Sequence, residues 1–376
     1  ETASVKVVKL QTGEIGTVVQ KEQKNGTVMV RIITELFLDY KFVHKTESEI
    51  QYVLQMNANS GIHQCGLFTL TDVNKFKVLF QEPILLPFAP RIQNSNDPLI
   101  VSKLQQWWTR INQLSNANKF AQFLNLSHHT KGPLVDAVDT FLSRHKAKML
   151  ELLHVDNEEE ELGALRKALL IDAANTFDQG AYELICRINH SCDPNTFIST
   201  HSRVISLRYI NKQEELTWNF LDDRYLYSCS KTRMQRLFQI CGFHCNCFRC
   251  KSHFDDARIF HCVTCGKPSI YVTYDVTEKK DGSELDISTK WYDCFECEYA
   301  LTAQDIECYV AAETEVDDII HLVMSGAMDK SWKEVVEYLQ TYLSDAHFKW
   351  FDLWYSIVWQ FDSGTETVCG KSLKYY

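Results

Sequence analysis

Cysteine residues concentrate in three short regions of this chain, and their spacing suits metal binding. The first segment is 188–195, INHSCDPN, in which an Asn-His pair precedes a cysteine and an Asp-Pro-Asn turn. The second segment, CNCFRC at 245–250, places three thiols close together. The third consists of two CxxC motifs, at 262–265 and 294–297. The chain has 14 cysteines and no visible secretory signal, so these clusters indicate metal sites rather than disulfides.

The two CxxC motifs predict a structural zinc ribbon. They flank a hairpin-like insert whose turn is Lys280-Asp281-Gly282. Four thiolates complete a tetrahedral zinc shell and leave no open position, so we expect this zinc to be structural and not catalytic. The predicted ligands are Cys262, Cys265, Cys294 and Cys297.

The CNCFRC segment supplies only three thiolates, so a second zinc needs a ligand from elsewhere in the chain. Cys192, from the INHSC segment, is the natural candidate, and Cys241 and His244 compete with it. If Cys192 binds the metal, it ties the INHSC segment to the cysteine-rich tail. That role also argues against a cysteine hydrolase that uses Cys192 with His190, because the metal would consume the thiol.

The rest of the chain must provide the elements that position these segments. Residues 1–52 alternate as short strands and contain a tight-turn signal at Asn25-Gly26. They predict a small β-rich module of SH3-like type or, alternatively, a sheet that packs on the next domain without a binding role. Residues 98–175 have helical apolar spacing. Strands are predicted again at 196–220, and helices after residue 314.

Composition limits the partners of the protein. The 376 residues carry a formal net charge of −10, which disfavours direct binding to nucleic acid and suits a basic partner such as a lysine-rich tail. The sequence contains no run of about 18 apolar residues, so we expect no membrane-spanning helix.

Three segments together resemble the SET domain of protein-lysine methyltransferases. They are INHSCDPN at 188–195, EELTWNFLDD at 214–223 and CGFHCNCFRC at 241–250. The resemblance spans roughly residues 55–300.

Upstream motifs are similar to those of the SET-and-MYND group within that family. They are GIHQCGLF at 61–68, Glu82-Pro83 and Asn175-Thr176-Phe177. Residues 66–185 contain no cysteine, so the MYND finger of that group is expected to be absent.

The resemblance implies an α+β fold, in which a SET-domain β-fold with a pseudoknot carries a helical insertion, a zinc-binding post-SET region and a helical C-terminus. The expected domains are a β-rich module at 1–52, a SET domain at 53–240 with a helical insert at about 98–175, a post-SET and zinc-ribbon region at 241–310, and a helical region at 311–376.

The resemblance also implies S-adenosylmethionine as cofactor and two zinc ions. The residues expected to contact the cofactor are Gly66, Leu67, Phe68, Asn175, Asn189, His190 and Phe243. The post-SET zinc would be bound by Cys192, Cys245, Cys247 and Cys250.

The catalytic channel departs from the family pattern. The usual tyrosine after the EELT strand is Phe220 here, and His201 stands where a second channel tyrosine is expected. A third aromatic position aligns with Cys241. Phenylalanine cannot donate a hydrogen bond to the substrate amine. Candidates to replace the hydroxyl are Tyr209, Tyr225 and Tyr227.

We therefore expect a protein-lysine N-methyltransferase that acts on histone or other protein lysines. The alternative is a weak or inactive SET-fold protein that serves as a scaffold or reader in a chromatin-associated complex. The expected partners are a lysine-containing protein, such as a histone tail, and chromatin-complex proteins, with no direct nucleic acid and no membrane. The resemblance implies a nuclear location, with the cytoplasm as the alternative.

Overall fold

The structure is a computed structural model of the 376-residue chain. It describes residues 7–11, 15–24, 27–36, 39–46, 50–57, 66–82, 84–85, 89, 99–113, 133–153, 158–177, 180–199, 201–279, 284–327 and 331–362. The chain divides into two units. The first is Glu1–Phe220 with Gln239–Phe243, and the second is Leu221–Phe238 with His244–Tyr376.

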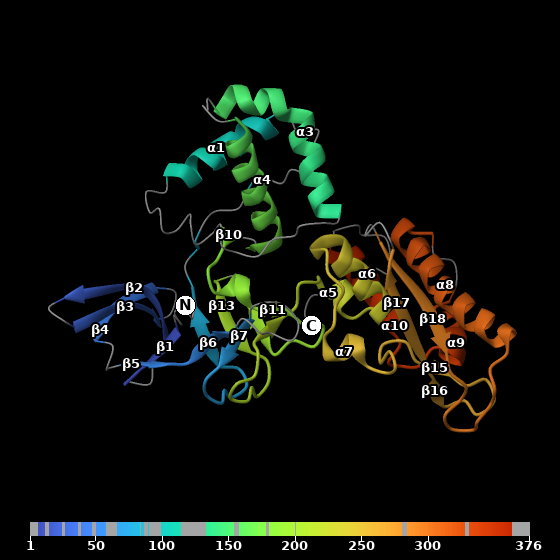
Figure 1. Cartoon of the computed structure of the whole chain (residues 1–376). Helices are drawn as coiled ribbons and strands as arrows, with labels where there is room; N and C mark the ends of the chain where they lie inside the picture. Colours follow the sequence, from blue (N-terminus) through green and yellow to red (C-terminus); the bar gives the residue numbers. More distant parts are fainter. Residues whose placement is uncertain are drawn as a thin grey trace. The chain divides into compact units, whose positions relative to one another are not determined.

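The first unit begins with a five-stranded antiparallel sheet (Figure 1). Its strand order is β4-β3-β2-β1-β5. The strands are β1 (Val7–Leu10), β2 (Ile15–Lys24), β3 (Thr27–Leu36), β4 (Asp39–Thr46) and β5 (Ile50–Tyr52). This sheet covers the segment whose alternation predicts strands. The expected turn at Asn25-Gly26 lies outside the described residues, and the SH3-like assignment stays a prediction.

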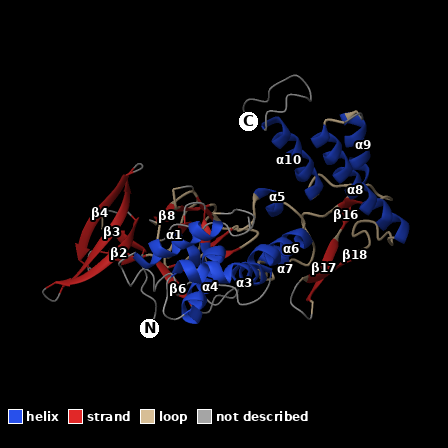
Figure 2. Cartoon of the chain, turned by 90° about the horizontal axis from the view of Figure 1, so that it is seen from above, coloured by secondary structure: helices blue, strands red, loops and turns tan. Residues whose placement is uncertain are grey.

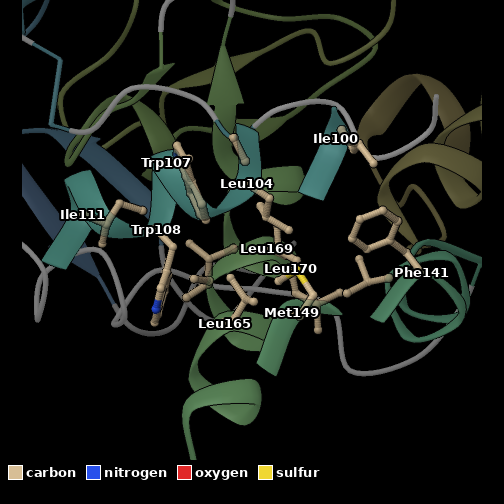
Figure 3. Close-up of a cluster of buried hydrophobic side chains, with 14 of the residues drawn as sticks. Ile100, Leu104, Trp107, Trp108, Ile111, Phe141, Met149, Leu165, Leu169 and Leu170 are labelled. Carbon is tan, nitrogen blue, oxygen red and sulfur yellow. The ribbon is translucent and has the colours of Figure 1, made fainter. Parts of the chain in front are cut away.

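Three helices follow, α1 (Ile100–Gln113), α3 (Pro133–Leu153) and α4 (Glu158–Asn175). Their apolar side chains form one buried cluster, because residues three and four apart lie on the same face of a helix (Figure 3). Trp107 of α1 and Leu169 of α4 belong to this cluster. The helices fall within the range that the apolar spacing predicts.

Small sheets form the remainder of the first unit. β6 (Leu54–Asn57) pairs with β7 (Gly66–Thr69), and β9 (Thr176–Phe177) pairs with β10 (Gly180–Ala181). A three-stranded sheet has the order β12-β13-β8, with β8 at Val78–Gln81, β12 at Thr196–Ile198 and β13 at Arg203–Ser206. A 3-10 turn, Ile185–Arg187, leads into β11 (Asn189–His190), which pairs with β14 (Thr217–Trp218). These short elements surround an apolar core that includes Leu67, Phe80 and Ile188.

The second unit combines a long two-stranded ribbon with helices (Figure 2). The ribbon consists of β17 (Val272–Glu278) and β18 (Leu285–Trp291), and β15 (Phe260–His261) pairs with β16 (Pro268–Ile270). The helices are α5 (Asp223–Leu226), α6 (Ser230–Cys241), α7 (Phe248–Lys251), α8 (Ala303–Ser325), α9 (Trp332–Tyr342) and α10 (Phe348–Asp362). The end of α6, from Gln239 on, is assigned to the first unit.

Helix α8 begins before position 311, where the sequence placed the start of the helical region. Thr302 caps it, since its hydroxyl accepts the N–H of Asp305 while the Asp305 carboxylate accepts the N–H of Thr302.

The buried face of α8 carries Glu313, which receives two hydrogen bonds from Arg258 at 2.6 and 2.7 Å. Burial opposes ionisation of Glu313, but the His347 imidazole, whose Nε2 lies 3.2 Å from Oε1, and the two hydrogen bonds from Arg258 outweigh it and lower the pKa of Glu313 to about 2. None of the described helices is long and apolar enough to cross a membrane.

Candidate functional site

Two segments that are distant in the sequence meet as parallel strands in the first unit. In the pairing of β11 with β14, Asn189 lies opposite Thr217 and His190 lies opposite Trp218. Strands this short cannot hold their register by backbone bonds alone. The register therefore depends on side chains that bridge the two segments.

Asn195 provides this bridge. Its side chain is almost fully buried, its Oδ1 accepts the backbone N–H of Thr217 at 2.8 Å, and its Nδ2 donates to the carbonyl of Glu215 at 2.7 Å. An asparagine carries both a donor and an acceptor, so it can replace backbone pairing on both sides of the crossing. This explains the asparagine that closes the Asp-Pro-Asn turn.

Gly66 comes very close to the crossing. The Nδ2 of Asn189 donates to Oε1 of Glu215 at 2.6 Å, and a Cβ at position 66 would lie 2.2 Å from that same oxygen. The neighbouring Leu67 carbonyl accepts the N–H of Leu216 at 2.7 Å, which keeps β7 against this segment. Only glycine fits beside this carboxylate unless Glu215 moves.

His190 is fully buried beside two aromatic rings. The N–H of Phe220 donates to its Nδ1 at 3.1 Å, so this nitrogen has no proton and the neutral ring carries its proton on Nε2. Nε2 lies 3.2 Å from Sγ of Cys192 and therefore donates to the sulfur. The ring centroids of Phe220 and Phe243 are 5.3 and 6.0 Å from that of His190. Both nitrogens of the imidazole are thus engaged within the protein.

The two CxxC motifs meet in the second unit. The sulfurs of Cys262 and Cys297 are 3.7 Å apart, as are those of Cys265 and Cys294. Four sulfurs at about 2.3 Å from a tetrahedral zinc would be about 3.8 Å from one another, which matches this spacing. The donor set and its dimensions therefore fit a zinc ion.

The two motifs also have the same backbone form. Gly266 and Glu298, each four residues after the first cysteine of its motif, have φ angles of +70° and +58°. In the second motif the Sγ of Cys294 lies 3.4 Å from the backbone nitrogens of Glu296 and Cys297 and 2.9 Å from Oγ of Ser269. Such donors stabilise thiolates and orient them toward a metal.

A second group of thiols contains the CNCFRC cysteines. Its ligand atoms all lie within 4.8 Å of one another, and it does not include Cys241 or His244. The members are Cys192, Cys245, Cys247 and Cys250. The described part of the chain thus holds two four-cysteine clusters.

A buried arginine lies beside the second group. Arg233 is fully buried, donates to the carbonyl of Ser228 and to Oγ of Ser230, and places its Nη2 3.9 Å from Sγ of Cys250. A guanidinium is permanently charged, so it offsets the negative charge of nearby thiolates.

Comparison with known proteins agrees with this arrangement. Residues 15–221 match the family model of the SET domain. The chain belongs to the SET-domain family.

Among curated proteins, the similarity to SMYD methyltransferases is distant and partial. The chain is 41% identical over 81 residues to histone-lysine N-methyltransferase SMYD3 of Homo sapiens, a match that covers 21% of this chain and 18% of that protein. It is 32% identical over 136 residues to N-lysine methyltransferase SMYD2-A of Danio rerio, covering 32% and 28%. It is 36% identical over 72 residues to SET domain and MYND-type zinc finger protein 6 of Schizosaccharomyces pombe, covering 18% and 14%. Each match spans less than a third of the relative's length.

Within the SET domain, Glu82 anchors the segment that leads into β11. Its buried carboxylate accepts four backbone N–H bonds of 2.9 to 3.1 Å, from Glu183, Leu184 and Ile185. Burial raises the pKa of Glu82 to about 7, although the bonds from the backbone act in the opposite direction. This side chain fixes the 3-10 turn that precedes Asn189.

The other expected cofactor residues of the SET domain occupy defined positions. Leu67 is buried, and Phe68 is half-buried and forms an isolated bridge with Glu215. Asn175 is buried at the end of α4, where its Nδ2 donates to the carbonyl of Ile171 at 2.8 Å. The structure therefore brings Gly66, Leu67 and Phe68 to the β11–β14 crossing.

The expected catalytic residues of the SET domain differ in their exposure. Phe220 is half-buried, and its ring centroid is 5.7 Å from that of Trp218 and 6.4 Å from that of Phe243. His201 is exposed in the turn before β13, and Tyr209 is 47% exposed, with its hydroxyl hydrogen-bonded to Asp72. The aromatic cluster at the crossing thus contains Phe220, while the Tyr209 hydroxyl interacts with Asp72.

Three side chains with clear roles had no assigned role from the sequence. Glu215 lies within the EELT run, which the sequence marked as a strand of the SET domain. The run itself does not show that the Glu215 carboxylate accepts a hydrogen bond from Asn189. Ser269 and Arg233 act on cysteines that are 25 and 17 residues away, so no local spacing marks them.

We expect acid to weaken the SET domain through Glu214. Burial opposes its ionisation, but hydrogen bonds from Arg208, Asn211 and Asn195 outweigh it and lower its pKa from 4.5 to about 2. The folded state thus holds this proton less tightly than the unfolded state, and the stability contributed by Glu214 is present above pH 4.5 and lost as the pH falls to about 2.

The variant Glu214→Gln should therefore show a smaller fall in unfolding free energy between pH 5 and pH 3 than the unmodified chain. Urea unfolding at both pH values measures this difference. Glu159→Gln, which removes an exposed carboxylate on α4, is the matched control and should keep the full slope. An unchanged slope for Glu214→Gln would contradict the assignment.

Proposed function

We propose that this protein is an S-adenosylmethionine-dependent protein-lysine N-methyltransferase that acts on histone or other protein lysines. The observation that carries the proposal is the parallel crossing of β11 with β14 in a chain of the SET-domain lysine methyltransferase family. The crossing places Asn189 and His190 beside Glu215, Phe220 and Phe243.

The residues at the crossing fit a cofactor with a charged and an aromatic part. Gly66 leaves the backbone of β7 free of a side chain, Asn189 offers a buried amide, and Phe243 offers a half-buried ring. Because both imidazole nitrogens of His190 are engaged, we assign its cofactor role to the main chain. S-adenosylmethionine would supply an electrophilic methyl group at this site.

The chain's own contribution to methyl transfer is to hold the lysine amine neutral and aligned. The amine must lose its proton before it can attack, and an apolar wall disfavours the ammonium form by desolvation. Phe220, with Trp218 and Phe243, would provide such a wall. Phe220 has no hydroxyl, so alignment of the amine would depend on the shape of the wall and on backbone carbonyls.

We also propose that each four-cysteine cluster holds one structural zinc. In each cluster the protein supplies four thiolates, so no position is left for a catalytic water. We extend the proposal to a nuclear location, for which the motif resemblance is the support.

The second candidate function is a scaffold or reader that has lost transfer activity. The observation that favours it is the absence of a hydroxyl at Phe220, together with the exposure of His201 and Tyr209. Cofactor binding alone does not separate the two functions, because an inactive protein can retain the site.

Calorimetric titration of the purified chain with S-adenosylmethionine, followed by incubation with labelled cofactor and mixed histones, tests the proposal. We expect binding and transfer of label to histone lysines. Binding without transfer to histones or to a cell extract favours the scaffold. The absence of binding would overturn the cofactor assignment.

The variant Gly66→Ala should weaken S-adenosylmethionine binding. The added Cβ displaces the Glu215 carboxylate and with it the hydrogen bond from Asn189, a loss of about 1.5 kcal/mol that corresponds to roughly tenfold in Kd. Calorimetric titration measures the change. Gly163→Ala is the matched control, because a Cβ there meets no atom within 4 Å and α4 should gain slightly in stability. Equal affinities for the two variants would contradict the role of Gly66.

A further inference from the structure

The outer face of α8 carries an open groove that the proposed methyl transfer does not use. The groove has a volume of about 480 Å³. Its lining residues, all on this helix, are Ile306, Glu307, Val310, Ala311, Thr314, Glu315 and Asp318. The opposite face of α8 is buried in the core of the second unit through Tyr309, Val316 and Ile319. The helix is therefore firmly held while its outer face is open.

The middle of the groove is mainly apolar. Ile306, Val310 and Thr314 follow one another at four-residue spacing, and Ala311 lies beside them. Val310 is 44% exposed, which is high for a branched apolar side chain on a well-packed helix. Rows of side chains four residues apart form the ridges and grooves against which another helix packs.

All charged residues that line the groove are acidic. Glu307, Glu315 and Asp318 line it, and α8 contains no lysine or arginine. Other carboxylates on α8 have cationic partners, as in Asp317 with Lys349 and Glu313 with Arg258. Among the described residues, the exposed carboxylates of Glu307 and Asp318 form no ion pair, unlike those of Glu313 and Asp317.

We propose that this groove docks a basic amphipathic helix of a partner protein. The apolar residues of the partner helix would cover Val310 and Ile306, and its lysine or arginine side chains would pair with Glu307 and Asp318. The groove runs from residue 306 to residue 318, so it accommodates roughly three helical turns of the partner. The acidic lining of the groove favours a basic partner helix, because the lysine or arginine side chains of that helix can pair with the carboxylates. A neutral or acidic partner would bury the carboxylates of Glu307 and Asp318 without a counter-charge, which is unfavourable. The proposal is independent of the methyltransferase activity.

The probe is a synthetic helical peptide of leucine, alanine and arginine that contains no lysine, titrated against the full chain by fluorescence anisotropy. Since it offers no amine side chain for methylation, its binding does not depend on the lysine site. Glu307→Arg combined with Asp318→Arg should weaken binding by about tenfold or more at low salt. Val310→Gln, which removes only the apolar contact, should weaken it by about fivefold.

Asp275→Arg combined with Asp286→Arg is the charge-matched control, since these exposed carboxylates lie on β17 and β18. The control should change Kd by less than about twofold. All of these substitutions are at exposed positions, and far-ultraviolet circular dichroism checks that the helices persist. No binding by the unmodified chain would overturn the proposal. So would equal weakening by the control or an unchanged Kd for Val310→Gln, because either result would indicate non-specific attraction between charges.

Discussion

Replacing Cys294 with serine is expected to remove one of two zinc equivalents and to destabilise the ribbon end of the second unit. The Cys294 side chain is 2% exposed, and its sulfur lies 3.7 Å from that of Cys265. A serine hydroxyl is a poor zinc ligand at neutral pH, so the remaining three thiolates would lose the ion. Structural zinc contributes folding free energy directly, and the expected loss is on the order of 5 kcal/mol.

The effect should reach beyond the metal because two of the proposed ligands belong to the apolar core. Cys262 and Cys294 pack in the same cluster as Phe260, Ile270 and Val272. Release of the zinc frees these strands and exposes apolar surface to water. Metal analysis by mass spectrometry and thermal unfolding measure the two parts of this prediction.

Cys308→Ser is the matched control for this substitution. Cys308 is half-buried on α8 and belongs to neither cysteine group. The control should retain both zinc equivalents, and its unfolding free energy should change by less than about 1 kcal/mol. A Cys294→Ser protein that still holds two zinc ions per chain would show that the ribbon cysteines do not bind metal.

Replacing Glu82 with glutamine is expected to have the second large effect. The carboxylate accepts four N–H bonds from three consecutive residues, Glu183, Leu184 and Ile185. An amide has only one oxygen, and its NH2 group would face backbone N–H donors that are buried. Buried donors without an acceptor cost about 1–3 kcal/mol each, so we expect a loss of roughly 2–4 kcal/mol in unfolding free energy.

The Glu82→Gln variant should also bind S-adenosylmethionine more weakly than the unmodified chain. The 3-10 turn that Glu82 holds leads directly into Ile188 and Asn189. Urea unfolding at pH 8 and calorimetric titration measure the two effects. Glu151→Gln removes an exposed carboxylate on α3 and should change neither quantity. Loss of stability with unchanged cofactor affinity would restrict Glu82 to a structural role.

The sequence predicted the elements and sites that depend on short-range spacing. The meeting of the four ribbon cysteines follows from two CxxC motifs, because residues three apart in a tight knuckle place their sulfurs on the same side whatever the rest of the fold does. The helices α1, α3 and α4 follow from apolar residues at three- and four-residue spacing. The SET-domain motifs at 188–195 and 214–223 were equally visible, because each is a continuous run of residues.

Only the tertiary structure decided which distant residues meet. Glu82 lies 101 to 103 residues before the backbone that it binds, and Asn189 lies 26 residues before Glu215. No periodicity relates positions so far apart, and the register of a two-residue parallel strand is set by its neighbours. The sequence by itself therefore determined the family motifs, the helices and the cysteines of the ribbon cluster. Three features depend instead on how segments distant in the sequence pack together. They are the close approach of Gly66 to Glu215, the proton position on His190 and the anchoring of the 3-10 turn by Glu82.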